Sequence, residues 1–329
     1  MTAQFDLTLI VPTVSRPALF ARALESALGQ DFDGRLQVIA SLNGAGEETH
    51  RALDRHLGNP RLQVFTHAQT IPTFDHFNFL RDRIDGKFCV FLSDDDWLEP
   101  DFAAAAMRYF ETEPDVAFLV CGCLMHYERL ALPALLGPSR QDGVHFLAEW
   151  VSGRRQVCFC ATVFPTAKLR ALGPLPDDII FGDMYYWVRL ACAGDVGSLD
   201  RPLSHYTVMM SGHRGESTMS DIRAWGRETA GLLQLAVNRV RLENASDIDC
   251  AAVERHADDY VARTIALQFV LKACAGISKS RLWRQARWAV RHLRGSSPRN
   301  WLAFGAALTL PRRLVSAMFR FALQRDRQH

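Results

Sequence analysis

The feature that most constrains the fold is a short apolar run that ends in three consecutive acids. Residues 87–100 read KFCVFLSDDDWLEP. Phe88 to Leu92 are all apolar, a pattern typical of a strand buried on both faces of a parallel sheet. Asp94, Asp95 and Asp96 follow almost directly, so we expect them just past the carboxyl end of that strand, where open α/β sheets bind ligands. The sequence therefore predicts an α/β fold with a polar site at this edge.

The acidic run favours a cation-binding site. Three adjacent carboxylates repel one another unless a cation neutralises them. Hard divalent ions such as Mn²⁺ or Mg²⁺, together with bound phosphates, suit an oxygen-rich setting. The alternative is a solvated acidic turn that caps a helix after Pro100. The buried strand before the acids and Trp97 after them favour the ligand site.

Several motifs together resemble a known family. In order, they are VPTVSRP at 11–17, Asn78, Gly86, FLSDDDW at 91–97 and GDMYYWVRLACAG at 182–194. Over residues 5 to 215 the chain resembles a family 2 glycosyltransferase of the GT-A fold. The resemblance implies a mixed, mostly parallel sheet flanked by helices. It also implies an inverting, metal-dependent transfer of sugar from a nucleotide-diphosphate donor to a glycan or lipid-linked acceptor in cell-surface polysaccharide synthesis.

The resemblance places nucleotide contacts in the first half of the chain. A strand that runs directly into a helix leaves backbone N–H groups for an anion, and here the family contacts fall on Thr13 and Arg16. Relatives often hold the base with an Asp that falls on Leu42 or Asn43 here, and Asn43 could still read a base edge because its amide both donates and accepts. Asn78 is expected near the nucleotide.

The acid motif departs from the family pattern. The common DxDD falls on Ser93-Asp94-Asp95-Asp96, so a serine replaces the first acid. On this register Asp94 faces the ribose or a metal-bound water, and Asp95 coordinates the metal directly. Asp96 is a second metal candidate or a helix cap. These departures keep open a degenerate domain that binds nucleotide or glycan without turnover.

The second half of the chain offers a general base and a pyrophosphate contact. Relatives often have Glu-Asp where this chain has Gly182-Asp183, so the base role falls on Asp183, with helix capping as the alternative. His213 or Arg214, in a polar loop, could meet the pyrophosphate as the loop closes. A nucleotidyltransferase is a further alternative, but VPTVSRP lacks the Gly-rich phosphate loop of such enzymes.

The pattern of apolar runs predicts a domain organisation. Residues 1–220 form the GT-A domain, with a nucleotide-binding half (1–110) and an acceptor half (111–220), and residues 221–329 are helical. Strands are expected at 7–11, 36–42, 62–65, 88–92, 116–123, 157–164 and 203–210, with a loop at 131–140. Ser15 is expected to cap the helix that starts at Pro17.

The helical region is basic, unlike the rest of the chain. Residues 276–329 carry twelve Lys/Arg and one acid, whereas the remainder carries 26 basic and 35 acidic residues. Within 281–294, arginines at helical spacing form one stripe: Arg284, Arg287, Arg291 and Arg294. This pattern predicts peripheral attachment to an anionic membrane. Packing against the body or against a second copy in a homodimer is the alternative, and no nucleic-acid motif is present.

Cysteine usage indicates a reducing compartment. The eight cysteines form no CxxC pair, and Cys121/Cys123 and Cys158/Cys160 are expected to lie in buried strands rather than on zinc. The start lacks a positively charged region, and no stretch approaches the ~20 apolar residues of a membrane span. We therefore predict a cytoplasmic protein, associated through its tail with the inner face of the cell membrane.

Overall fold

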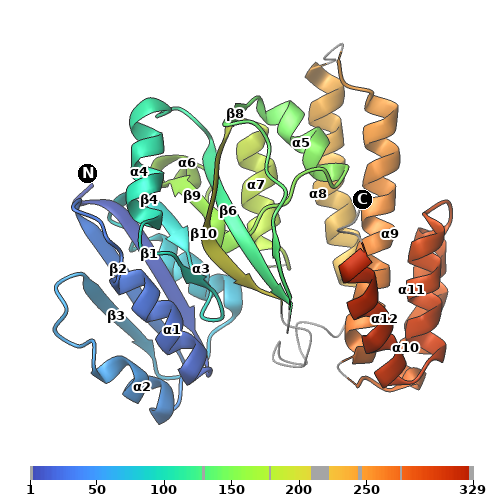
Figure 1. The fold of residues 1–329 in the computed structure, drawn as a ribbon, viewed down its shortest axis with the longest axis horizontal. Coiled ribbons are helices and arrows are strands. Elements are labelled where there is room, and N and C mark those ends of the chain that lie inside the picture. Colours follow the sequence, from blue (N-terminus) through green and yellow to red (C-terminus); the bar gives the residue numbers. More distant parts are fainter. Residues whose placement is uncertain are drawn as a thin grey trace. The chain divides into compact units, whose positions relative to one another are not determined.

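The computed structural model describes residues 3–127, 130–177, 179–208, 222–243, 247–274 and 276–325 (Figure 1). The chain divides into two compact units. The sheet unit comprises Met1–Trp150 and Arg154–Val208, and the helical unit comprises Val151–Gly153 and Met209–His329. The predicted domain boundary at 220/221 lies outside the described residues and stays a prediction.

The sheet unit is built on one mixed, mostly parallel sheet, as predicted. Its described strands run in the order β3-β2-β1-β4-β9-β6-β10-β5, with β7 paired to β6 and β8 paired to β10. The neighbours β3, β2, β1 and β4 are all parallel, so their carboxyl ends meet at one edge. The strand bounds are β1 (Phe5–Thr13), β2 (Leu36–Asn43), β3 (Leu62–His67), β4 (Gly86–Phe91), β5 (Trp97–Leu98), β6 (Phe118–Tyr127), β7 (Leu130–Pro133), β8 (Arg140–Gln141), β9 (Thr162–Pro165) and β10 (Val196–Thr207).

Helices flank both faces of this sheet (Figure 1). They are α1 (Pro17–Leu28), α2 (Glu47–Asp54), α3 (Thr73–Arg81), α4 (Phe102–Thr112), α5 (Gly143–Val151), α6 (Thr166–Ala171) and α7 (Gly182–Ala191). Strand β4 is buried from both sides, as its apolar run predicts. Val90 joins the core formed with α1 and α4, whereas the ring of Phe91 lies 5.4 Å from Phe77 of α3 and 6.4 Å from Tyr186 of α7.

Strand β10 is parallel to β6 but irregular. Leu199 pairs with Cys121 and Ser204 with Cys123, so β10 uses five residues where β6 uses two. The extra residues bulge opposite Gly122, where a Cβ atom would lie 2.0 Å from the carbonyl oxygen of Arg201. Glycine is required there because the two backbones approach so closely.

One strand prediction and one loop prediction in the second half were partly wrong. The segment 157–164 is a 3₁₀ turn (Phe159–Ala161) before the short β9, because the turn stacks Phe159 on Phe91 with ring centroids 5.2 Å apart. Cys160 therefore lies in the turn rather than in a strand. The predicted loop at 131–140 contains β7 and β8, and Pro133 is tolerated at the end of an edge strand.

The helical unit contains α8 (Ile222–Glu243), α9 (Cys250–Cys274), α10 (Lys279–Leu293), α11 (Pro298–Thr309) and α12 (Arg312–Arg325). Helix α9 packs against the other four, which explains why it buries residues all around its axis. Helix α10 is amphipathic and buries one side: Leu282, Ala286, Ala289 and Leu293. Within the described residues, no helix is both long and apolar enough to cross a bilayer.

Candidate active site

The acidic loop lies beside the loop that follows β1. Strand β4 ends at Phe91, and the N–H of Leu92 still donates to the carbonyl of Ile10 in β1 at 2.8 Å. The chain then turns, and the hydroxyl of Thr13 donates to Asp94 Oδ2 at 2.6 Å. Because β1 and β4 are parallel neighbours, their carboxyl ends place these two loops in contact.

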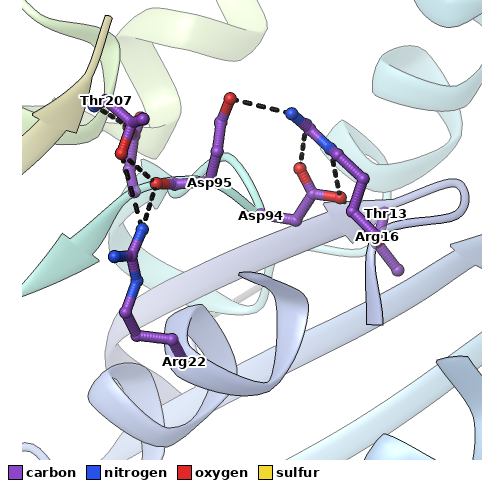
Figure 2. A network of polar contacts seen from close by, with 7 residues as sticks. Thr13, Arg16, Arg22, Asp94, Asp95 and Thr207 are labelled. Atoms are coloured by element: carbon purple, nitrogen blue, oxygen red, sulfur yellow. Dashed lines mark hydrogen bonds and ion pairs between the residues drawn. The ribbon is translucent and has the colours of Figure 1, made fainter. Parts of the chain in front are cut away.

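Arg16 bridges two of the three acids (Figure 2). Its Nη1 donates to Asp95 Oδ2 at 2.8 Å, its Nε donates to Asp94 Oδ2 at 3.3 Å, and its Nη2 forms an ion pair with Asp94 Oδ1. The helix-capping prediction for Ser15 was wrong. Arg16 is the residue at the start of α1, and no side chain caps this helix. The structure thus brings together Thr13, Arg16, Asp94 and Asp95.

Burial and the neighbouring charges shift the pKa values of Asp94 and Arg16 in opposite directions. The side chain of Asp94 is 3% exposed and that of Arg16 is 27% exposed. Burial raises the pKa of Asp94, and the adjacent guanidinium and the Thr13 hydroxyl partly offset that rise. Burial also lowers the pKa of Arg16, but the two carboxylates outweigh it and leave the pKa raised. Arg16 is therefore a permanent positive charge held against the acids.

The third acid, Asp96, connects the loop to β10. It is 1% exposed, and its Oδ1 accepts a hydrogen bond from the backbone N–H of Thr207 at 2.8 Å. Its Oδ2 is buried with no hydrogen-bond partner among the described residues. Burial raises the pKa of Asp96 well above its ordinary value, and the charge of Asp95 acts in the same direction. The suggested capping role is not observed, because α4 begins after Asp101.

Arg22 holds the acidic loop from its other side. Its Nη2 donates to the carbonyl oxygen of Asp95 at 2.6 Å, and that oxygen also accepts the hydroxyl of Thr207 (Figure 2). The guanidinium lies 3.8 Å from the centre of the Trp97 ring, a distance at which a cation is attracted to the π-face. The loop is thus fixed by contacts from α1 and from β10.

Behind Trp97 lies a line of hydrogen-bonded titratable groups. His205 stacks on Trp97 with ring centroids 4.5 Å apart. Its Nε2 lies 2.6 Å from Glu99 Oε1, and its Nδ1 lies 2.9 Å from Nε2 of His126. A single tautomer of His205, which donates from Nε2 to Glu99 and accepts at Nδ1 from His126, satisfies both contacts. The line supports Trp97, and through it the end of the acidic loop.

Comparison with known proteins identifies the type of domain. Residues 8–128, which span β1 to β6, match the family described as "Glycosyl transferase family 2". This segment is a family 2 glycosyl transferase domain. No curated protein matches the chain.

Solved structures of glycosyl transferases share the fold. S. aureus TarS residues 1–349, in complex with UDP-GlcNAc, is 12% identical with a TM-score of 0.58 and covers 92% of this chain and 90% of its own. The mannosyltransferase PcManGT from Pyrobaculum calidifontis, in complex with GDP-Man and Mn²⁺, is 18% identical with a TM-score of 0.55, covering 96% and 87%. The predicted GT-A fold, with its helical C-terminal region, is confirmed.

Two residues that were expected to contact the nucleotide make hydrogen bonds within the protein. Asn43 donates through Nδ2 to the carbonyl of Ile71 at 3.0 Å and accepts from the N–H of Ile71 at 2.9 Å. Asn78 makes the same pair of bonds with Leu175, at 2.9 and 2.8 Å. Each amide therefore imitates a strand neighbour and clamps a loop. This geometry argues against base reading by Asn43, because both of its polar atoms are already bonded.

The structure describes the expected general base, Asp183, but not the two residues expected to contact the pyrophosphate. Asp183 lies in the first turn of α7, and its Oδ1 accepts from the N–H of Met184 at 2.8 Å. The negative charges of Asp96 and Asp183 both contribute to raising the pKa of the buried Cys158 thiol. His213 and Arg214 lie outside the described residues.

The acidic pair suits part of a divalent-cation site. Asp94 and Asp95 supply hard carboxylate oxygens, which Mn²⁺ and Mg²⁺ prefer. Among the described residues no group of three or more His, Cys, Asp and Glu is placed to hold a metal ion. Such ions usually keep waters and take further ligands from bound phosphates. The residues therefore fit a cation that the protein holds jointly with a nucleotide.

Sequence reasoning missed Arg22, Thr207 and the line from Glu99 to His126. Arg22 lies in α1, six residues after Arg16, and this is not the i,i+3 or i,i+4 spacing that places two helical side chains side by side, so its contact with the acidic loop had no signal in the sequence. Thr207 and His205 gave no signal, because they reach the site only through the pairing of β10 with β5, in which His205 lies opposite Trp97.

Proposed function

We propose that this chain transfers a sugar from a nucleotide-diphosphate donor to a hydroxyl of a glycan or lipid-linked acceptor, with inversion. The observation that carries the proposal is the acidic pair Asp94–Asp95 joined to Thr13 and Arg16 at the carboxyl edge of β1 and β4. Such edges bind nucleotides in open α/β sheets, and the segment concerned belongs to a glycosyl transferase family.

In this proposal Asp183 acts as the general base. The acceptor hydroxyl is a weak nucleophile and needs a carboxylate within hydrogen-bond reach. As Asp183 takes the hydroxyl proton, the oxygen attacks the anomeric carbon from the side opposite the nucleoside diphosphate. The new sugar–oxygen bond forms as the bond to phosphate oxygen breaks, so the configuration inverts. The amide of Met184 orients the Asp183 carboxylate.

The leaving diphosphate requires neutralisation. A divalent cation held by Asp95, with Asp94 beside it, would supply Lewis-acid stabilisation of the departing phosphate. Arg16 adds a guanidinium at the start of α1, where backbone N–H groups also favour an anion. One of the similar structures is a complex with UDP-GlcNAc and another is a complex with GDP-Man and Mn²⁺, and we propose a donor of this chemical class here.

Turnover of nucleotide sugars tests this function. Purified full-length protein would be incubated with UDP- and GDP-sugars, Mn²⁺ or Mg²⁺, and mixed glycan or lipid-linked acceptors. Release of nucleoside diphosphate with a glycosylated product of inverted anomeric configuration is the expected result. Nucleotide binding without product from any donor would indicate a binding domain instead. Release of pyrophosphate would indicate a nucleotidyltransferase.

We also propose that the helical unit binds an anionic membrane on the cytoplasmic side. Arg284, Arg287 and Arg291 are exposed, on the side of α10 opposite its buried residues. Within the described part of the chain these three and Arg294 form no ion pair. The account in which the stripe packs against acids of the protein therefore has no support from the described residues.

Aromatic residues strengthen the membrane proposal. Trp283 is 55% exposed and lies beside the stripe, one turn before Arg287. Trp side chains favour the bilayer interface, and each arginine near an anionic surface contributes about 1 kcal/mol at low salt. Membrane attachment would keep the enzyme near lipid-linked acceptors for cell-surface polysaccharide. The cysteines are all unpaired thiols, as expected on the reducing side of the membrane.

A further inference from the structure

The bridge made by Arg16 leaves little of the acidic pair available to a metal ion. Asp94 accepts hydrogen bonds on both oxygens, from Thr13 and Arg16 on Oδ2 and from Arg16 on Oδ1. Asp95 uses Oδ2 for Arg16. Its Oδ1 accepts no hydrogen bond from the residues that the structure describes. One free carboxylate oxygen is a poor site for an ion that prefers six ligands.

The bridge also supplies the charge that a metal would bring. The carboxylates of Asp94 and Asp95 are 3% and 13% exposed, so water screens their repulsion poorly. The Arg16 guanidinium, between them, neutralises much of that repulsion. A divalent cation entering beside it would meet a like charge within a few ångströms, which is unfavourable at low dielectric.

We propose that Arg16 is an internal counter-ion that competes with the divalent cation for Asp95, so that the cation binds together with the nucleoside diphosphate. This inference rests on the proposed function. The diphosphate provides the guanidinium with alternative partners, since arginine pairs well with phosphate oxygens in a two-pronged geometry. As Arg16 moves to the phosphates, both oxygens of Asp95 become available. No covalent bond changes in this exchange.

The exchange makes metal and nucleotide affinity mutually dependent. If a diphosphate strengthens Mn²⁺ binding by some factor, Mn²⁺ strengthens diphosphate binding by the same factor. Nucleotide-free protein should therefore bind Mn²⁺ weakly. A nucleotide without phosphates, such as uridine or guanosine, should not improve that binding, because it offers Arg16 no anionic partner.

Mn²⁺ binding to the full chain, followed by electron paramagnetic resonance of the free ion, tests the proposal without turnover. The probes are Mn²⁺ alone, and Mn²⁺ with UDP or GDP. Arg16→Gln removes the charge but keeps a hydrogen-bond donor. We expect nucleotide-free Mn²⁺ affinity to rise by about tenfold, and the gain from added diphosphate to shrink by about the same factor. Arg16→Lys, a point charge that cannot bridge both acids, should lie between.

Arg22→Gln is the matched control. Arg22 contacts the same loop, but through the backbone carbonyl of Asp95 rather than its carboxylate, so Mn²⁺ affinity should change by less than about threefold. An equal gain in both variants would show a general effect of charge and overturn the proposal. So would an unchanged affinity in folded Arg16→Gln and Arg16→Lys, where folding is verified by circular dichroism. Failure of sugar transfer with these linkages intact would instead contradict the proposed function alone.

Discussion

The backbone N–H of Thr207 donates a hydrogen bond to Asp96 Oδ1 at 2.8 Å, although the two residues are 111 positions apart. This contact ties the end of β10 to the acidic loop. In this contact Asp96 needs only an oxygen atom that accepts a hydrogen bond, and a neutral side chain could provide it. A metal ligand, in contrast, would need the negative charge of the carboxylate.

Replacements at Asp96 separate these two roles. Asp96→Asn keeps an acceptor oxygen for Thr207, so we expect turnover to stay within about tenfold of the wild type. Asp96→Ala loses the anchor and should lower kcat/KM further, as the loop loses its fixed position. Steady-state kinetics with a saturating divalent cation measures both. Loss of all activity in Asp96→Asn, with an intact fold, would show that Asp96 is a metal ligand after all.

Asp95 is the acid for which charge is expected to be essential. Asp95→Asn is nearly isosteric, so the fold should remain while turnover is abolished, since the neutral amide no longer attracts the cation. Activity of the wild type should also disappear in excess EDTA and return with Mn²⁺ or Mg²⁺. Thermal unfolding of the variant serves as the folding control. Full activity of Asp95→Asn, or of the wild type in EDTA, would contradict the metal assignment.

For Asp183 we expect an effect on chemistry rather than on donor binding. Asp183→Asn should lower kcat by ~10²-fold or more, the loss expected for a general base. Its Oδ1 can still accept from Met184, so the start of α7 should be preserved. Donor affinity, measured by calorimetry with a nucleoside diphosphate, should change little. A collapse of affinity together with early melting would show that Asp183 is a structural residue of α7.

His76 should make stability depend on pH. It is 3% exposed, its Nε2 lies 2.7 Å from the Ser41 hydroxyl, and burial lowers its pKa to about 4, with a smaller contribution from His67. An unfolded histidine titrates near 6.5. Between these values the unfolded state binds more protons, so this contribution to stability is complete above about pH 6.5 and is lost as pH falls toward 4.

The expected slope is at most about 1.4 kcal/mol per pH unit. Urea unfolding of the wild type and of His76→Gln between pH 4.5 and 7.5 isolates it, because other titrating groups cancel in the difference. The free energy of unfolding of the wild type, relative to that of the variant, should decrease as the pH is lowered from 7.5 to 4.5. A difference that stays constant across this range would show that His76 does not titrate as described.

The arginine stripe of α10 should determine vesicle binding. Replacing Arg284, Arg287, Arg291 and Arg294 by Gln should abolish co-sedimentation with anionic vesicles at low salt, because about 1 kcal/mol per charge is removed. Wild-type binding should weaken at high salt. The control replaces four exposed basic residues of the sheet unit: Arg51, Lys87, Arg108 and Arg154. Equal loss in both variants would indicate net charge alone, and no wild-type binding at any salt would exclude membrane attachment.

The first half of the fold was predicted from the sequence more fully than the candidate site was. The run ending in Leu92 indicated a buried strand because side chains on both of its faces are apolar. The partners of the acids were harder to predict. Arg16 could have contacted phosphate alone, and nothing in its neighbours indicates a bridge between Asp94 and Asp95. Such contacts depend on how far β1 extends before α1 starts, which local patterns do not determine.

The contacts between β10 and the acidic loop could not be predicted from the sequence for a different reason. Thr207 meets the acidic loop only because the preceding segment bulges opposite Gly122, and a bulge leaves no periodic mark in the sequence. Likewise, Asn43 and Asn78 were expected near the nucleotide, and the structure shows their amides hydrogen-bonded to Ile71 and Leu175. Residue type indicated hydrogen bonding in each case, and the tertiary structure selected the partner.

Because of the bulge in β10, sequence changes in this segment can alter the candidate site without disrupting the sheet. Residues 200–203 lengthen β10 without altering its pairing to β6 before Leu199 or after Ser204. A deletion there could leave the sheet hydrogen-bonded while moving a different residue opposite His126, where Thr207 now lies. Insertions and deletions in this short segment would therefore alter which side chains reach the acidic loop. They offer evolution a way to change the enzyme's selectivity while its scaffold stays constant.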